Sequence, residues 1–388
     1  MDSARTAQTA PGGLVLNREI TLPVGTLQLA WDETDWQLDD LCEFGTRQYA
    51  SRGFLIISRV LGRHLPSSPL VMRNAIKDLA RLVPAALPGP ALFVGMAETA
   101  ITLGQGVYEA CLDRIGFADS IFLHSTRQLT GNPLLATFSE PHSHASAHAV
   151  HRPKDAALIN TLSDVRSIVL VDDEVTTGQT FVNLAVALRL HLPALERIDV
   201  VSLTDWSGDS AYLARMPLPA CSAALLSGRL DWTSGSGRNP CTPKATAQNA
   251  LGRFRERANL GRQGVRGRPF DVSTFRSRLA PLGTEPLHVI GTGELHFPAF
   301  LLAELLAAEG LDVLVQATTR SPIRLGASIS QALEVADPYG AGVPNFLYNL
   351  DQTRNRRRIV CAETLPRSSF DDLLRPGDVG LLDMGTCT

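Results

Sequence analysis

Short apolar runs that recur along the chain between helix-compatible segments constrain its fold more than any other feature. Residues 91–97 (ALFVGMA), 120–126 (SIFLHST) and 167–173 (SIVLVDD) are three such runs, and 197–206 (RIDVVSLTDW) is a fourth. Runs this short and apolar on both faces are typical of strands buried inside a parallel sheet. Strands that alternate with helices form such sheets, with helices on both faces. The sequence therefore predicts an α/β fold.

A second unit of the same kind follows a break in this pattern. Over residues 229–278 the chain is rich in Gly, Ser, Pro and Arg, with 11 basic residues against 3 acidic ones. This composition is typical of a linker or an ordered irregular crossover. Apolar runs resume at 287–293. A length of 388 residues is sufficient for two domains. The expected parts are a first domain over 1–235, a linker or crossover over 236–284, and a smaller C-terminal α/β domain over 285–388.

Charge and composition exclude several classes of partner. A net charge of −3 argues against a general nucleic-acid or membrane-surface binder, so neither partner is expected. The six cysteines are scattered without a Cys-x-x-Cys pair, which is typical of reduced thiols and not of a disulfide framework or a zinc site. No apolar leader opens the sequence, and no later run reaches membrane-spanning length. A cytoplasmic protein is therefore expected.

The most informative motif is SIVLVDDEVTTGQT at 167–180. The predicted strand places Asp172 and Asp173 at its carboxyl end, where open α/β sheets bind their ligands. The turn from Thr176 to Thr180 supplies successive backbone N–H groups, hydroxyls and a glycine, and it leads directly into a predicted helix. Backbone N–H groups at a helix N-terminus bind anions. The motif therefore predicts two acids beside a phosphate cradle.

Two other interpretations of the motif stay open from the residues alone. A phosphoacceptor receiver domain also uses paired acids after a strand, but it needs a lone acceptor acid and a lysine beyond that acid. Asp205 fits the acceptor position, whereas no lysine follows at a suitable strand end. The third interpretation is purely structural: an acidic strand end followed by Thr residues that cap a helix.

The motif resembles the signature that binds phosphoribosyl pyrophosphate (PRPP) in type I phosphoribosyltransferases, a hydrophobic strand followed by two acids and a Thr-Gly-x-Thr loop. The resemblance implies that family's fold, a parallel sheet with flanking helices and a hood. It also implies that Asp172 and Asp173, next to Glu174, contact the ribose hydroxyls and the Mg²⁺ that PRPP carries as cofactor. The implied 5′-phosphate loop consists of Val175, Thr176, Thr177, Gly178, Gln179 and Thr180.

The strand at 91–95 is followed by the stretch where this family places its pyrophosphate loop. Small residues there allow backbone N–H groups to face a diphosphate. Glu98 is expected either to reach magnesium or to cap the next helix. The expected loop consists of Gly95, Met96, Ala97, Glu98 and Thr99.

Two further stretches supply candidate catalytic residues. Arg127 follows the next strand and is either a charge clamp on the diphosphate or a solvated arginine. In the His-rich stretch 138–153, His142 and His144 are candidate acid–base residues of a lid that excludes water, and Glu174 is a third acid–base candidate. A solvated loop and a metal site are the alternatives for this stretch.

The order of these stretches, together with the segment 51–69, resembles a bacterial branch of the family that carries a C-terminal domain named for a Thr-Arg-Ser-Pro signature. Here TTRSPI lies at 318–323, and GTGELHFPAF begins at Gly291. Both stretches follow predicted parallel strands, so they are expected to converge on a phosphorylated ligand or to form two packing turns. The candidate residues of this second site are Gly291, Gly293, Glu294, Thr319, Arg320 and Ser321. The resemblance also suggests a place in tellurite-resistance gene clusters.

The implied reaction transfers ribose 5-phosphate from PRPP to a nucleobase-like acceptor with release of pyrophosphate, in an expected homodimer. The C-terminal domain is expected to bind or modify the product. The acceptor stays open: 6-oxopurine enzymes place an acid at the position of Thr176, so the pattern is closer to orotate or adenine enzymes. The alternative is a non-catalytic sensor of PRPP or a nucleotide on the same fold.

Overall fold

The computed structural model describes most of the 388 residues. The described ranges are 6–10, 13–47, 53–116, 119–140, 147–235, 251–256, 258–279, 282–363 and 371–382.

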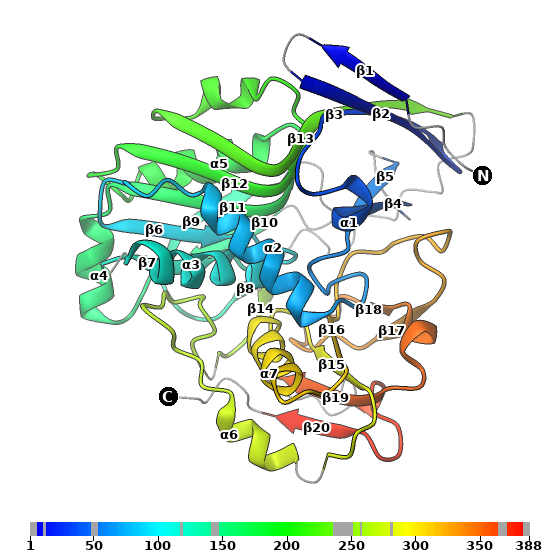
Figure 1. Ribbon diagram of the computed structural model, residues 1–388. Coiled ribbons are helices and arrows are strands. Elements are labelled where there is room, and N and C mark those ends of the chain that lie inside the picture. Colours follow the sequence, from blue (N-terminus) through cyan, green and yellow to red (C-terminus); the bar gives the residue numbers. More distant parts are fainter. Residues whose placement is uncertain are drawn as a thin grey trace.

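An eight-stranded sheet forms one half of the molecule (Figure 1), with the strand order β1-β2-β3-β13-β12-β11-β6-β7. The five strands from β13 to β7 are parallel, and the apolar runs predict four of them, β6, β7, β11 and β12. The sequence did not indicate β13 or the antiparallel extension that β1 to β3 form. β13 joins the two parts, because its first half pairs with β12 and its second half with β3. The strands are β1 (Thr6–Ala10), β2 (Gly13–Leu22), β3 (Gly25–Asp32), β6 (Ala91–Gly95), β7 (Ile121–His124), β11 (Ser167–Val175), β12 (Arg197–Asp205) and β13 (Ala220–Ser234).

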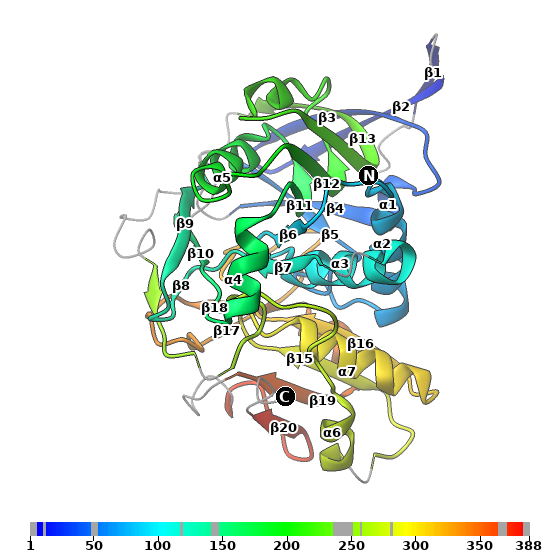
Figure 2. The ribbon, with the colours of Figure 1, turned by 90° about the vertical axis from the view of Figure 1, so that its left-hand side faces the viewer.

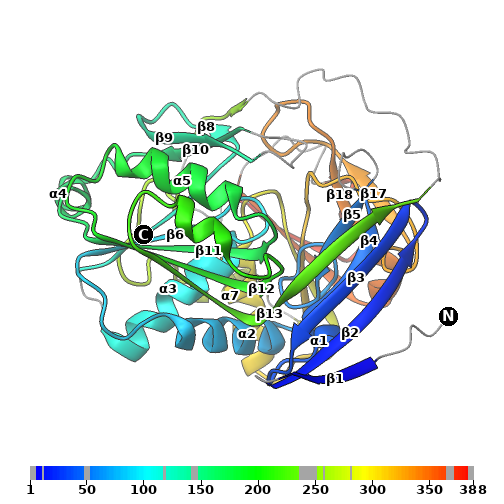
Figure 3. The ribbon, with the colours of Figure 1, turned by 90° about the horizontal axis from the view of Figure 1, so that it is seen from above.

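Helices cover both faces of the parallel strands (Figures 2 and 3). α2 (Pro69–Leu82) and α3 (Ile101–Ile115) lie on one face, and α4 (Ala156–Ser163) and α5 (Gln179–Arg189) lie on the other. α2 is amphipathic: its buried residues recur at helical spacing, so one stripe of the helix packs on the core. None of the helices in the described ranges is long and apolar enough to cross a membrane.

A second, four-stranded sheet forms the other half of the molecule and is entirely parallel, in the order β16-β15-β19-β20. Its strands are β15 (Leu287–Gly291), β16 (Val313–Ala317), β19 (Arg357–Ala362) and β20 (Val379–Leu382). α7 (Phe297–Ala308) packs between this sheet and the pair α2 and α3 (Figure 1). Because α7 has buried partners on both sides, one hydrophobic core runs from the first sheet into the second.

The remaining elements are short. The antiparallel hairpin β4–β5 packs on the C-terminal half, where Leu55 and Ile57 join Ile323, Ile329 and Tyr348 in a small separate core. β9 and β10 form a second hairpin beside α5. The short elements are α1 (Leu38–Leu41), β4 (Cys42–Thr46), β5 (Phe54–Ser58), β8 (Gln128–Leu129), β9 (Leu134–Ser139), β10 (Ala147–His151), β14 (Gly252–Arg253), α6 (Ser273–Arg276), β17 (Ala332–Val335) and β18 (Asn345–Tyr348), with the 3₁₀ helices η1 (Ala211–Arg215), η2 (Ser277–Leu279) and η3 (Leu350–Thr353).

The described part of the segment between the two sheets is an ordered crossover. Arg262 from this segment is 0% exposed and lies between three carboxylates. Its guanidinium donates to Glu363 at 2.7 and 2.9 Å, to Glu294 at 2.8 Å and to Glu256 at 3.4 Å. Burial alone would lower the pKa of Arg262, but the charges of Glu363 and Glu294 outweigh burial and raise it. This ion-pair cluster fastens the crossover between the two halves.

Because the two sheets share one core, we expect a single calorimetric unfolding transition. Arg262→Met leaves Glu294, Glu363 and Glu256 buried without their cation, so it should lower the free energy of unfolding by roughly 3–5 kcal/mol and keep one transition. Arg166→Met is the matched control, because Arg166 pairs with Glu196 at the surface and such pairs contribute about 1 kcal/mol or less. Two separate transitions, of which Arg262→Met shifts only one, would contradict the shared core.

Candidate active site

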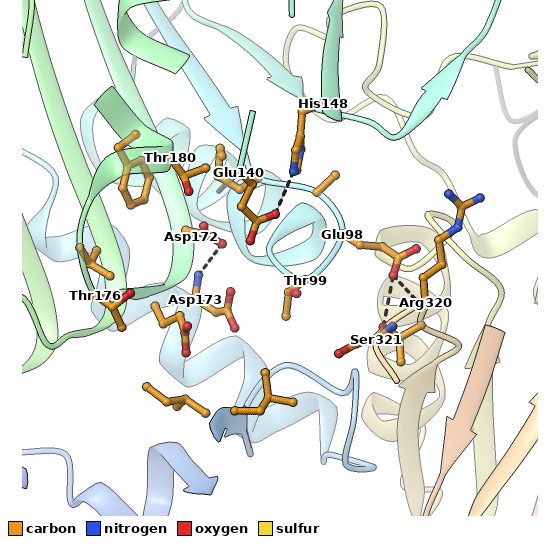
Figure 4. Close-up of a pocket in the computed structure, with 18 of the residues that line it drawn as sticks. Glu98, Thr99, Glu140, His148, Asp172, Asp173, Thr176, Thr180, Arg320 and Ser321 are labelled. Carbon is orange, nitrogen blue, oxygen red and sulfur yellow. Dashed lines mark hydrogen bonds and ion pairs between the residues drawn. The ribbon is translucent and has the colours of Figure 1, made fainter. Parts of the chain in front are cut away.

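A pocket opens at the carboxyl ends of β6 and β11, and residues of both halves of the molecule line it (Figure 4). This is the edge at which open α/β sheets bind their ligands. Its lining consists of Arg47, Leu55, Ile56, His64, Met96, Ala97, Glu98, Thr99, Arg127, Glu140, His148, Asp172, Asp173, Glu174, Val175, Thr176, Thr177, Gly178, Thr180, Phe181, Thr319, Arg320 and Ser321.

Two adjacent acids lie at the centre of the pocket, at the end of β11 (Figure 4). The backbone N–H of Asp173 donates to Asp172 Oδ1 at 2.9 Å. Burial and the neighbouring charge of Asp173 raise the pKa of Asp172 well above its ordinary value. Burial and the charge of Glu174 raise the pKa of Asp173 to about 6. The ligand-free pair therefore resists full ionisation, and its oxygens are poised to accept hydrogen bonds from hydroxyl donors.

The turn after β11 presents unused backbone N–H groups to the pocket. Those of Thr177, Gly178 and Thr180 donate to no protein acceptor within the described ranges, and α5 begins at Gln179. Gly178 has a φ of 64°, and a Cβ there would lie 2.1 Å from the ring of Tyr212. Only glycine fits this position, because both the left-handed backbone and the packed ring exclude a side chain. The turn therefore has the arrangement of N–H groups at a helix N-terminus that suits an anion.

A second cradle follows β6. The N–H of Met96 donates to Val171 O at 3.0 Å, and that of Ala97 donates to Ser125 Oγ at 2.8 Å. The N–H groups of Glu98 and Thr99 have no protein acceptor among the residues that the structure describes. The Ala97–Glu98 peptide is cis. This loop therefore offers two further N–H groups, across the acids from the first cradle (Figure 4).

Glu98 connects this loop to the C-terminal half. Its Oε2 accepts hydrogen bonds from Thr319 Oγ1 at 3.2 Å and from the Arg320 N–H at 3.1 Å. Its carbonyl accepts from Arg63 Nη2 at 2.7 Å. α3 has Ala100 as its N-cap, without a side-chain capping bond, so the expected helix cap by Glu98 is wrong. The Glu98 carboxylate is held by the C-terminal half and not directed at the paired acids.

A chain of polar side chains runs along the edge of the pocket. Arg127 Nη2 donates to Glu140 at 2.8 Å, and His148 Nε2 lies 3.0 Å from the same carboxylate. His148 Nδ1 lies 3.2 Å from Ser125 Oγ, which accepts from Ala97. Burial would raise the pKa of Glu140, but the hydrogen bond from His148 and the charge of Arg127 hold it well below its ordinary value. Arg127 is therefore an ion-paired residue at the pocket edge and not a solvated one.

Comparison with known families decides what the two halves are. A phosphoribosyl transferase family model matches residues 41–229, and a TRSP domain model, described as C-terminal to that transferase, matches residues 271–374. The chain is a phosphoribosyl transferase domain fused to a TRSP domain. Its family is one of pentosyltransferases, and its fold is the type I phosphoribosyltransferase fold with a second α/β unit. The paired acids and both cradles lie inside the transferase match.

Several solved adenine phosphoribosyltransferases are similar to about half of this chain. Adenine phosphoribosyltransferase from Rhodothermus marinus is 15% identical, with 48% of this chain and 94% of that chain covered and a TM-score of 0.31. The enzyme from Trypanosoma brucei is 12% identical, with 50% and 82% covered and a TM-score of 0.34. The enzyme from Leishmania donovani is 14% identical, with 49% and 78% covered and a TM-score of 0.33. These scores are too low to add to the family assignment. No curated protein matches the chain.

The two TRSP-domain stretches that were expected either to converge on one phosphorylated ligand or to form two packing turns lie in different surroundings. Gly291, Gly293 and Glu294 line no part of the pocket: a Cβ on Gly293 would lie 2.6 Å from the Tyr339 ring. Glu294 is buried, where it accepts from Thr126 Oγ1 at 2.7 and 2.8 Å and from the Arg127 N–H at 3.1 Å. Thr319, Arg320 and Ser321 instead join the transferase pocket. The stretch with Gly293 and Glu294 therefore packs against the transferase domain, whereas the stretch from Thr319 to Ser321 lines the transferase pocket.

The other predicted residues divide into three groups. Gly95 and Gln179 flank the pocket without lining it, while the remaining predicted residues of the two loops line it. His142 and His144 lie outside the described residues. The sequence interpretation missed several lining or supporting residues, although Glu140 and His148 belong to the His-rich stretch and Arg63 and His64 belong to the segment 51–69. The missed residues are Arg47, Leu55, Ile56, Arg63, His64, Glu140, His148 and Phe181.

We expect Asp173→Asn to stabilise the ligand-free protein. The folded-state pKa of Asp173, about 6, lies above its ordinary value, so the folded protein loses stability as the pH rises from that ordinary value to about 6, and the loss is constant above pH 6. The variant should therefore gain on the order of 1–2 kcal/mol at pH 8 and much less at pH 4. Thermal unfolding at the two pH values measures this, with the exposed Asp35→Asn as control. Equal stabilisation at both pH values would contradict the raised pKa of Asp173.

Proposed function

We propose that this protein transfers ribose 5-phosphate from PRPP to a nucleobase-like acceptor and releases pyrophosphate. The observation that supports this most is the arrangement of three parts in one pocket: the acids Asp172 and Asp173 lie between two backbone N–H cradles, at 176–180 and 96–99. PRPP has the same order of groups, a 5′-phosphate, a ribose diol and a 1-diphosphate. N–H cradles suit the two anionic ends, and carboxylates suit the hydroxyls between them.

The chemistry follows from this placement. In the proposed reaction the bond between the anomeric carbon and the diphosphate breaks, a bond to the acceptor nitrogen forms, and that nitrogen loses a proton. Positive charge develops at the anomeric carbon as the diphosphate leaves. Asp172 and Asp173 would stabilise that charge while they orient the ribose, and the two cradles would hold both ends of the donor in line.

Magnesium is the proposed cofactor, bound mainly through the donor. Within the described ranges no group of three or more His, Cys, Asp or Glu side chains is arranged to hold a metal by itself. The carboxylate oxygens of Asp172 and Asp173 are nevertheless the hard ligands that Mg²⁺ prefers, and a PRPP diphosphate would supply the others. Bound there, the ion would neutralise charge on the diphosphate.

The acceptor is proposed to lie against the N-terminal side chains of the pocket. Leu55 and Ile56 provide aliphatic surface that suits the face of a planar ring. His64 lines the same pocket, and its Nε2 has no protein partner in the described part of the chain. Burial, with the charges of Arg63 and Arg47, lowers the pKa of His64 to about 3. A neutral imidazole offers one donor and one acceptor, which suits the edge of a nitrogen heterocycle.

Gly178→Ala tests the 5′-phosphate cradle. A methyl group there would collide with Tyr212 and strain the left-handed backbone, so the turn must move. We expect calorimetry with Mg²⁺ to show PRPP binding to the wild type and roughly 100-fold weaker binding to the variant. Gly116→Ala is the matched control, because Gly116 has a similar φ of 66° but no atom within 4 Å of the added Cβ.

Absence of PRPP binding by the wild type would contradict the proposed function. A screen of purine and pyrimidine bases for PRPP-dependent pyrophosphate release then separates enzyme from sensor. Release with any base supports the transferase, whereas tight binding without turnover for every base supports the sensor.

A further inference from the structure

The TRSP-domain turn from Thr319 to Ser321 contacts the transferase domain through one residue of the 96–99 loop. That residue is Glu98, whose Oε2 accepts from Thr319 Oγ1 and from the Arg320 N–H. Figure 4 shows these contacts on the side of the pocket away from Thr176 and Thr180. Hydrogen bonds to a carboxylate are stronger than those between neutral groups. The carboxylate therefore fastens the loop to the turn.

The backbone of Glu98 is linked to the TRSP domain through the side chain of Arg63. Arg63, which is 1% exposed, donates from Nη2 to Glu98 O at 2.7 Å. From Nη1 it donates to Gly293 O at 2.8 Å and to Thr318 O at 2.7 Å. Both ends of Glu98 are thus held by groups that belong to the TRSP domain or are bound to it.

The turn is itself rigidly supported. Thr319 Oγ1 accepts from the Ser321 N–H at 3.2 Å, and the Thr319 N–H donates to Phe346 O at 2.9 Å. Tyr348 donates its hydroxyl to Ser321 O at 2.6 Å and accepts from the Ile323 N–H at 2.9 Å. A group held by such a shell can fix the geometry of its neighbour.

One side chain of the turn faces into the pocket. In Figure 4 Ser321 lies across from Thr99, whereas the Arg320 guanidinium points away. Arg320 donates to Asp337 at 3.4 Å, so it forms an ion pair inside the TRSP domain. Ser321 Oγ makes no hydrogen bond to the part of the chain that the structure describes, and Ser321 lines the same pocket as Glu98 and Thr99. The turn thus adds a hydroxyl donor to the 96–99 cradle.

We propose that the TRSP domain completes the transferase site: Thr319 is a positioning residue that sets the 96–99 loop through Glu98, and Ser321 donates its hydroxyl to the diphosphate of the donor. This inference rests on the proposed function, since it assigns the diphosphate to that loop. The TRSP domain would then take part in the transfer of ribose 5-phosphate itself and not only bind or modify the product.

The test compares two ligands that differ only in the diphosphate. We expect Thr319→Val and Glu98→Gln each to weaken PRPP binding about tenfold in calorimetry with Mg²⁺, because each removes part of one contact. Binding of ribose 5-phosphate, which lacks the diphosphate, should stay unchanged in both variants. A general loss of structure would weaken both ligands. Thr319→Ser retains the hydroxyl and should restore PRPP binding.

The double variant shows whether the two residues act together. If Thr319 acts through Glu98, the double variant should bind PRPP no more weakly than the weaker single variant. Thr353→Val is the matched control, because Thr353 is buried in the same domain and its hydroxyl donates, among the described residues, to Leu350 O. Ser321→Ala should likewise weaken PRPP and spare ribose 5-phosphate.

Three results would overturn the inference: unchanged PRPP binding in Thr319→Val, equal loss for both ligands, or a double variant weakened about 100-fold, the product of independent effects. Wild-type protein that binds neither ligand would instead defeat the proposed function itself. Wild-type binding together with unaffected variants would leave that function intact and remove only the role of the TRSP domain.

Discussion

The buried guanidinium of Arg63 joins the parts of this molecule that the chemistry needs in one place. It donates to three backbone carbonyls, one in the transferase loop and two at the ends of TRSP-domain strands. Burial lowers the pKa of Arg63, while the charge of Glu98 opposes that effect. A cation this deeply buried needs hydrogen-bond acceptors, and the carbonyls that Nη1 and Nη2 use come from both domains, so Arg63 holds the two domains together. This link brings the TRSP-domain turn to the wall of the transferase pocket.

Charge in the pocket is separated into two regions with different tasks. At the centre, Asp172 and Asp173 repel one another and have raised pKa values, which is a cost that a ligand with hydroxyl groups would relieve. At the edge, Glu140 is compensated by Arg127 and His148 and stays ionised. The first pair is suited to ligand binding and the second set to holding the loop beside Ser125. Acids with raised pKa values, surrounded by ion-paired side chains, are typical of binding sites.

The sequence was sufficient for features that depend on local pattern. Apolar runs predicted the parallel strands of both sheets except β13. The strand, acids and glycine turn at 167–180 predicted a cradle whose position 178 only glycine fits. Features that depend on distant contacts were not predictable. Arg63 meets carbonyls 230 and 255 residues further along the chain, and no local pattern marks such a pair. Gly293 and Glu294 looked like a ligand turn for the same reason: their partners, Tyr339 and Arg262, are far away in sequence.

A crystal structure of the protein with PRPP and Mg²⁺ tests the central claim, one active site built from two domains, most directly. We predict the 5′-phosphate on the N–H groups of 176–180, the ribose on Asp172 and Asp173, and the diphosphate between the 96–99 loop and Ser321. PRPP bound outside this pocket, or bound with its diphosphate turned away from the TRSP domain, would contradict the account.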